Sequence, residues 1–139
     1  MGARLPAACL VLGLALVLSA CAGPATRHVV APDALGPYSG AVDAGAFVFV
    51  SGKVGRERST FRAEAASCLD AVSAELTGLG LSLADVVSAT VYLTDIDDYG
   101  AFNEVYREVV PGPWPARACV AVAALPGGAR VEVQVVARR

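Results

Sequence analysis

One arginine stands at the start of an apolar segment that has the composition of a buried strand. Arg117 is followed by Ala118, Cys119 and two valines with alanine between them. An unpaired guanidinium buried in such a strand would carry a large desolvation cost. A planar guanidinium binds a carboxylate through two parallel hydrogen bonds. The pattern therefore predicts that Arg117 binds a carboxylate, which belongs either to the protein or to a small acidic ligand.

The other residues limit the kinds of chemistry available. His28 is the only histidine and lies near the start of the chain, which argues against histidine-based triads and most zinc sites. We expect neither a metal nor a cofactor. The net charge of −2 comes from interspersed acids and bases, so no nucleic-acid-binding surface is indicated. Cys68 and Cys119 are too few for a disulfide framework and are expected to stay free.

The first twenty residues have the pattern of an export signal. Arg4 precedes an apolar run at residues 10–18 that is too short to span a bilayer as a helix. Leu-Ser-Ala-Cys at 18–21 then matches a lipobox, in which Cys21 becomes the lipidated first residue. We therefore expect a lipoprotein-type signal peptide at 1–20, a tether at 21–28 and the ordered domain at 29–139.

Two other interpretations of this segment stay open. Ala20, Cys21 and Ala22 also satisfy the small-residue rule of an ordinary signal peptidase, which would release a soluble periplasmic protein. Alternatively, translation starts further downstream and the protein is cytoplasmic. The N-terminal lipid is the only contact with a membrane that we expect.

Hydrophobic periodicity predicts six strands and two helices in the remaining chain. Ser59 or Thr60 caps the first helix, which ends at Gly78 to Gly80. Asp97 caps the second helix, which runs to about Val109. The predicted strands are 29–30, 38–42, 47–50, 86–94, 117–123 and 131–137. The order β-β-β-α-β-α-β-β predicts an α+β sheet with both helices on one face. An oligomer would cover the other face, because the stripe Val131, Val133 and Val135 must be buried.

Four separated segments resemble the RidA (YjgF) family of enamine/imine deaminases. The matching segments are 31–39 (APDALGPYS), 49–52 (FVSG), 91–95 with 102–106 (VYLTD and FNEVY), and 115–117 (PAR) through 125–126 (LP) to 131–133 (VEV). They extend over nearly the whole expected domain. The resemblance implies a chorismate-mutase-like fold and a homotrimer with ligand clefts between subunits.

The resemblance also implies which residues form the site. Arg117 corresponds to the arginine that holds the substrate carboxylate, and Glu132 to the glutamate that places the attacking water. The positions that would line or support the pocket are Tyr38, Ser51, Gly52, Asn103 and Cys119.

Three residues depart from the family pattern. Gly40 and Lys53 stand where glutamine is common, and Ala71 where a helix asparagine is frequent; the loop 55–60 is also shorter than usual. Because Lys53 and this loop are expected near the cleft, the departures bear on substrate size and affinity more than on the reaction type.

The implied reaction is hydrolysis of reactive 2-imino and 2-enamino acids to 2-oxo acids and ammonia, as in 2-iminobutanoate/2-iminopropanoate deaminases. An iminium carbon is already electrophilic, so Arg117 would hold the carboxylate while Glu132 orients or deprotonates one water. Purely structural interpretations of Arg117 and Glu132 also stay open. Arg117 could pair with Glu132 or Asp95 as a structural bridge between subunits, and Glu132 could simply face solvent by strand alternation.

The implied reaction and the expected export disagree, because reactive imino and enamino acids arise mainly in the cytoplasm. Three hypotheses follow. The protein is a deaminase acting on imino acids in or crossing the periplasm, or it binds a small carboxylate such as a 2-oxo acid without turnover. In the third, a lipid-anchored trimer binds unfolded or partner proteins.

Overall fold

The structure is a computed structural model that describes residues 25–32 and 34–139. The predicted signal peptide at 1–20 and the lipidation of Cys21 lie outside these residues. Within the described part, no helix is long and apolar enough to cross a membrane.

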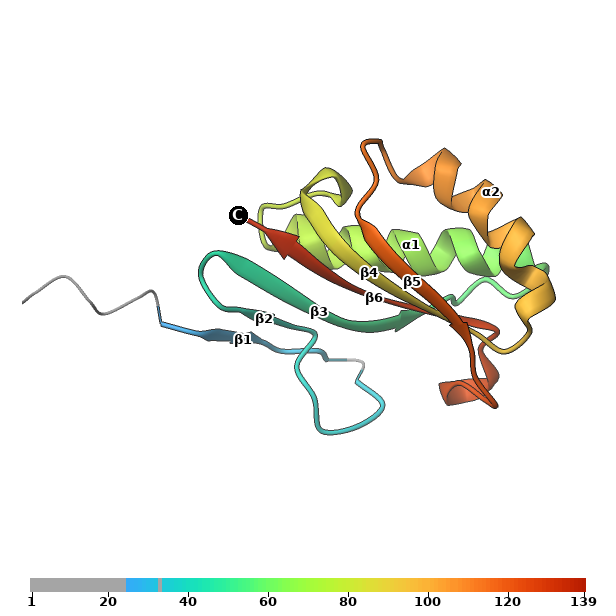
Figure 1. Cartoon of the computed structure of the whole chain (residues 1–139). Coiled ribbons are helices and arrows are strands. Elements are labelled where there is room, and N and C mark those ends of the chain that lie inside the picture. The colour runs from blue at the N-terminus through green and yellow to red at the C-terminus, as the bar shows by residue number, and fades with distance from the viewer. Residues whose placement is uncertain (1–24, 33) are drawn as a thin grey trace, which may run out of the picture.

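A six-stranded sheet carries both helices on one face (Figure 1). Its strands are β1 (Arg27–Val29), β2 (Ala41–Asp43), β3 (Phe47–Val54), β4 (Val86–Leu93), β5 (Ala116–Ala121) and β6 (Val131–Arg138). They lie side by side in the order β1-β2-β3-β6-β4-β5. Only the β4–β5 pair is parallel among the pairs described; the others are antiparallel. The predicted α+β fold is confirmed.

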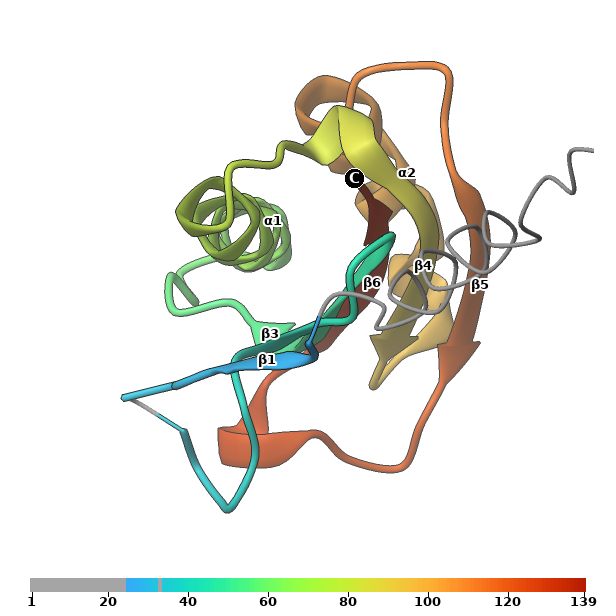
Figure 2. The same cartoon turned by 90° about the vertical axis from the view of Figure 1, so that its left-hand side faces the viewer.

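The two helices are α1 (Phe61–Gly78) and α2 (Tyr99–Val109). The Thr60 side chain caps α1 by accepting a hydrogen bond from the backbone N–H of Ala63, as predicted. The predicted cap of the second helix, Asp97, is wrong by one residue, because the residue that precedes α2 is Asp98, and its side chain makes no capping hydrogen bond. Asp95 accepts the N–H of Asp97 instead, which forms a short 3-10 turn before α2 begins. Figure 2 shows α1 over β3 and β6, and α2 behind β4 and β5.

The first two strands also differ from the prediction. β1 begins at Arg27, two residues before the expected domain boundary. β2 begins at Ala41 rather than Tyr38. The backbone N–H of Tyr38 bonds to the carbonyl of Gly36 in a local turn, so Tyr38 lies in the β1–β2 loop and cannot pair in the sheet.

The apolar stripe of β6 is covered within the chain. Val131, Val133 and Val135 all belong to the core under the two helices, so this stripe gives no argument for an oligomer and that expectation is corrected. The opposite face carries large apolar side chains that the described residues leave exposed. Phe47, Phe49 and Val120 on this outer face are 41–47 % exposed.

Glu64 of α1 joins two distant loops to the helix. It is the one fully buried charged residue in the described part of the chain. Its carboxylate accepts bonds from the backbone N–H of Arg130 at 2.8 Å and from the Nε of Arg130 at 2.7 Å. The Nε of Arg58 lies 3.8 Å away. Burial of this carboxylate is thus compensated by charge and by hydrogen bonds.

Replacing Glu64 with alanine should lower the free energy of unfolding by about 3–5 kcal/mol, because Arg130 would lose its buried partner. Glu104 is the matched control: it pairs with Arg62 on the exposed surface, and its alanine variant should cost no more than about 1 kcal/mol. Chemical denaturation of both variants measures the difference. Equal losses would contradict the assigned role of Glu64.

Candidate active site

Arg117 lies on the helix face of the sheet, at its β5 edge. It pairs in register with Ala89, which pairs in turn with the buried Val135, and paired residues point to the same face. The guanidinium donates a hydrogen bond from Nη2 to the Oδ1 of Asn103 on α2. It also lies over three aromatic rings of α2, at 4.7 Å from Tyr106, 5.6 Å from Phe102 and 5.9 Å from Tyr99.

No carboxylate in the described part of the chain neutralises the charge of Arg117. Among residues 25–32 and 34–139, no carboxylate lies within ion-pair distance of it. One hydrogen bond to a neutral amide uses one of its five N–H donors. The aromatic faces favour the cation without competing for those donors. The guanidinium is therefore both fixed in direction and able to bind an anion.

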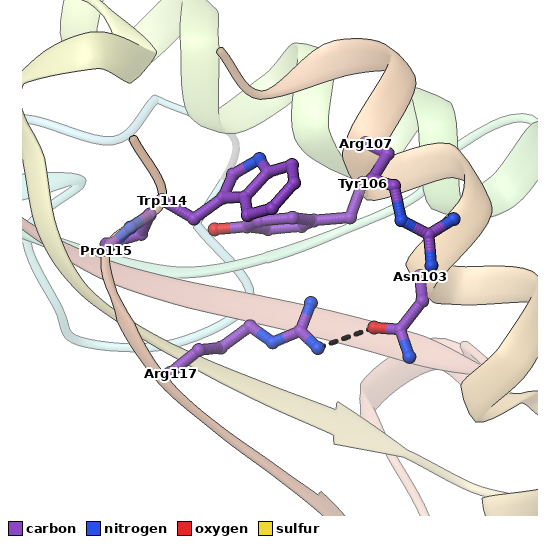
Figure 3. A pocket seen from close by; sticks show the side chains of 6 residues that line it. All are labelled: Asn103, Tyr106, Arg107, Trp114, Pro115 and Arg117. Atoms are coloured by element: carbon purple, nitrogen blue, oxygen red, sulfur yellow. Dashed lines mark hydrogen bonds between the residues drawn. The ribbon is translucent and has the colours of Figure 1, made fainter. Parts of the chain in front are cut away.

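Two cavities flank the guanidinium. The first, of about 380 Å³, is lined by Asn103, Tyr106, Arg107, Trp114, Pro115 and Arg117 (Figure 3). In Figure 3 the guanidinium points toward Tyr106 and Asn103. The second, of about 470 Å³, is lined by Ile96, Asp97, Tyr99, Arg117 and Cys119. A small acid can thus approach Arg117 from either side.

Cys119 lies on the same face as Arg117, two residues further along β5. Burial raises the pKa of its thiol, although the Arg117 charge acts in the opposite direction. The thiol is therefore protonated at neutral pH and is a poor nucleophile. Cys119 is suited to lining the cavity. Cys119 and Cys68 are both free.

Glu132 lies on the opposite face of the sheet from Arg117. It stands between Val131 and Val133, which both point to the helices, so its own side chain points to the outer face. Strand β4 separates β6 from β5. Burial raises the pKa of the Glu132 carboxyl, and no described residue donates a hydrogen bond to it in this structure. Within one protomer, Arg117 and Glu132 therefore cannot touch the same small ligand.

The remaining candidate residues are connected to Glu132 through Gly52. The Glu132 carboxyl lies so close to Gly52 that a Cβ added there would overlap its Oε1. Gly52 sits where the register of β3 shifts against β6. Tyr38 and Gly52 line one cavity, while Ser51 donates a hydrogen bond to the carbonyl of Ser39 at 2.7 Å. Ser51 thereby ties the Tyr38 loop to β3.

Replacing Gly52 with alanine should displace the Glu132 carboxyl. If Glu132 has the catalytic role expected from the sequence, kcat should fall about 10- to 100-fold, since misplacing a catalytic group by about 1 Å has effects of this size. Gly100 of α2 is the matched control, because a Cβ there would meet nothing within 4 Å. Steady-state kinetics of both alanine variants test this. A Gly52→Ala enzyme with full activity would show that Glu132 needs no such close approach.

The seven candidate residues thus form two sets. Arg117, Asn103 and Cys119 lie together on the helix face; Tyr38, Ser51, Gly52 and Glu132 lie together elsewhere. The aromatic side chains that cover Arg117 were not identified from the sequence. The signal was present, because Tyr99, Phe102 and Tyr106 recur at helical spacing. Trp114 and Arg107 carried no comparable signal.

Comparisons with known proteins identify the family of the chain. Residues 28–139 match the family model described as Endoribonuclease L-PSP. Protein DfrA of Myxococcus xanthus is 40 % identical over 116 residues, which cover 77 % of this chain and 88 % of that protein. The 2-iminobutanoate/2-iminopropanoate deaminase of Mus musculus is 40 % identical over 114 residues, which cover 77 % of this chain and 84 % of that protein.

Solved structures give the same result. RidA from the Antarctic bacterium Psychrobacter has a TM-score of 0.75 at 40 % identity and covers 78 % of this chain and 94 % of its own. TdcF of E. coli with bound serine has a TM-score of 0.74 at 36 % identity, with 78 % and 93 % covered. The fold, the separated motifs and these matches lead to one conclusion: the chain belongs to the Endoribonuclease L-PSP family, which is the RidA (YjgF) family that its motifs resemble.

Proposed function

We propose that the protein is a hydrolytic deaminase that converts reactive 2-imino and 2-enamino acids to 2-oxo acids and ammonia. The observation that carries the proposal is the Arg117 guanidinium, which is oriented by Asn103 and aromatic rings and is paired with no carboxylate of the described chain. Such a group suits the substrate carboxylate. The deaminase name of the mouse relative and the serine bound to TdcF support a small amino-acid-like substrate.

In this proposal each site is shared by two protomers of a homotrimer. Arg117 and Glu132 point to opposite faces of one sheet, so both reach one substrate only if they come from different copies. The uncovered apolar side chains of the outer face, among them Phe47, Phe49 and Val120, supply a surface for such contact. Arg117 of one protomer and the set of Tyr38, Gly52 and Glu132 of the next then enclose the substrate.

The chemistry follows from these roles. Arg117 holds the carboxylate and so fixes the iminium carbon. Glu132 accepts a proton from water as the water oxygen bonds to that carbon, which gives the tetrahedral carbinolamine. The proton then passes from Glu132 to the amine, the carbon–nitrogen bond breaks to release ammonia, and the hydroxyl proton passes to that ammonia as the carbonyl forms. An iminium ion and one water thereby become a 2-oxo acid and an ammonium ion.

Mixing two inactive variants tests the shared site. Arg117→Ala and Glu132→Gln subunits are unfolded and refolded together in equal amounts, and deamination of an imino acid made in situ by an amino-acid oxidase is timed. Random trimers should recover about a quarter of the wild-type rate, because each mixed trimer contains one intact site. Each variant refolded alone is the control. No recovery, from mixtures shown to be trimeric, would contradict the shared site.

We also propose that the mature protein is exported and that Cys21 carries a lipid. Support comes from the sequence of residues 10–21 alone. The intact mass of the mature N-terminus, measured together with the membrane fraction, tests this. A soluble protein that keeps residues 1–20 would contradict it.

A further inference from the structure

The first cavity beside Arg117 has an aromatic wall that the proposed reaction does not use. Trp114, the only tryptophan of the sequence, lines this cavity of about 380 Å³, and we refer to it as the Trp114 cavity. In the described part of the chain its lining residues are Asn103, Tyr106, Arg107, Trp114, Pro115 and Arg117. The volume lies within the range of about 300–1,000 Å³ that is usual for small-molecule sites.

The indole ring of Trp114 is held in place although it is largely exposed. Trp114 is 58 % exposed, and its Nε1 donates a hydrogen bond to the carbonyl of Val110 at 3.2 Å. Prolines at 111, 113 and 115 surround it in the sequence, and each proline fixes its own φ angle. The indole ring is therefore positioned beside the cavity before any ligand binds, which lowers the entropic cost of binding.

Arg107 brings a cation to the same cavity. In Figure 3 its side chain and the indole ring of Trp114 come from opposite sides of the view, with Arg117 below both. Arg107 is exposed, and among residues 25–32 and 34–139 no carboxylate lies within ion-pair distance of it. A guanidinium stacks on aromatic rings. Two groups of the wall, the indole and this guanidinium, thus suit a flat aromatic ring.

The Trp114 cavity begins at the group that we assign to the substrate carboxylate. Arg117 lines both this cavity and the one on the side of Cys119. In a 2-imino acid the imine nitrogen and the side chain both leave the carbon next to the carboxylate. The carboxylate of Asp97 lines the Cys119 side and suits the positively charged iminium nitrogen. An apolar side chain is therefore better placed in the Trp114 cavity.

We infer that the Trp114 cavity receives the side chain of the imino acid and selects an aromatic one, so that the substrates are aromatic 2-imino acids. This inference rests on the proposed function and names its substrate class. Contacts between aromatic rings, and between a ring and a cation, stabilise a complex beyond the burial of apolar area. A saturated ring of the same size buries a similar area but makes neither contact. Aromatic character is selected, and not hydrophobicity alone.

Matched substrates test the selection. The imino acids derived from phenylalanine and cyclohexylalanine differ only in whether the six-membered ring is aromatic. Each is made in situ by a flavin-dependent amino-acid oxidase, and the enzyme-dependent release of the 2-oxo acid is timed. We expect kcat/KM for the phenyl substrate to exceed that for the cyclohexyl substrate by about three- to tenfold.

Variants of the two wall groups should lower this ratio by different amounts. Trp114→Leu keeps an apolar side chain without a ring system, and the phenyl-to-cyclohexyl ratio should fall to about one. Trp114→Phe keeps an aromatic ring and should retain most of the ratio. Arg107→Gln removes the cation and should lower the ratio about two- to threefold. Arg62→Gln changes the net charge equally, but at the exposed surface, and should leave the ratio unchanged.

Trp114 fluorescence gives a second readout that requires no turnover. Because the sequence has a single tryptophan, selective excitation of tryptophan reports on this cavity. We expect 3-phenylpropanoate to change the emission of Trp114. By calorimetry it should bind at least about threefold more tightly than 3-cyclohexylpropanoate, and Arg117→Ala should weaken the binding of both acids.

The outcomes separate this inference from the proposed function. Turnover of imino acids with a phenyl-to-cyclohexyl ratio near one, or a ratio that Trp114→Leu leaves unchanged, overturns the inference and leaves the deaminase intact. If no imino acid is turned over, the proposed function fails, and the two propanoates decide the selection. Tighter binding of 3-phenylpropanoate with a change in Trp114 emission supports it; equal affinities, or an unchanged emission at saturation, overturn it.

Discussion

Replacing Arg117 with alanine should lower kcat/KM for imino acids by ~10²- to 10³-fold. Removing one member of a hydrogen-bonded charge pair has an effect of about 3–4 kcal/mol, which corresponds to a rate factor of this size. Much of the loss should appear as a higher KM, because the carboxylate is bound both before and during the reaction. Steady-state kinetics with an oxidase-coupled supply of substrate measures the change.

Two variants sharpen this test. Arg117→Lys keeps the charge but lacks the planar pair of donors, so it should recover only part of the activity. Arg62→Ala removes an arginine that pairs with Glu104 and Glu108 on the exposed surface and should act like the wild type. An Arg117→Ala protein that folds, assembles and keeps its full rate would show that the substrate carboxylate binds elsewhere.

Replacing Glu132 with glutamine should lower kcat by about 10²- to 10⁴-fold, the usual contribution of a general base. The pH profile gives a second readout. Burial raises the pKa of Glu132, so its ionised form is lost at a higher pH than for an exposed glutamate. The acid limb of the wild-type profile should therefore lie above the ordinary carboxylate range, and the residual activity of the glutamine variant should lack that limb.

The stability of the Glu132→Gln variant distinguishes a catalytic role of Glu132 from a structural one. Because the folded protein holds the Glu132 proton more tightly than the unfolded chain does, the protonated form is the more stabilising one. That contribution is present at low pH and is lost as the pH rises through the raised pKa. Glutamine imitates the protonated form, so the variant should be at least as stable as the wild type at neutral pH. A lower Tm would indicate that Glu132 mainly supports the fold.

The helices and most strands could be predicted because their signals are local. Thr60 precedes a run with apolar residues at helical spacing, and valines alternate along β6. Local signals failed where a loop residue resembled a strand residue. Tyr38 has strong strand propensity, yet its N–H is used within a turn. The periodicity of apolar residues does not show with which carbonyl oxygen a backbone N–H forms its hydrogen bond.

The arrangement of the site residues in space could not be predicted from the sequence. Alternation along β6 shows that Glu132 points away from the valines beside it, but not where Arg117 points. That depends on the parallel pairing of β5 with β4 and on the order of strands in the sheet. Similarly, Gly40 and Lys53 were recognisable as unusual residues, while their common neighbour Glu75 lies 22 residues beyond Lys53. Only folding brings the three together.

The position of β6 has a consequence for how the protein is made. Strand β6 follows all the other strands of the sheet in the sequence, yet it lies between β3 and β4 and pairs with both. The sheet therefore cannot close until residues 131–138 have left the ribosome, and the earlier strands wait without their central partner. Until β6 pairs, the β1-β2-β3 and β4-β5 halves have no strand to join them, so the nascent chain exposes two unpaired inner edges at once.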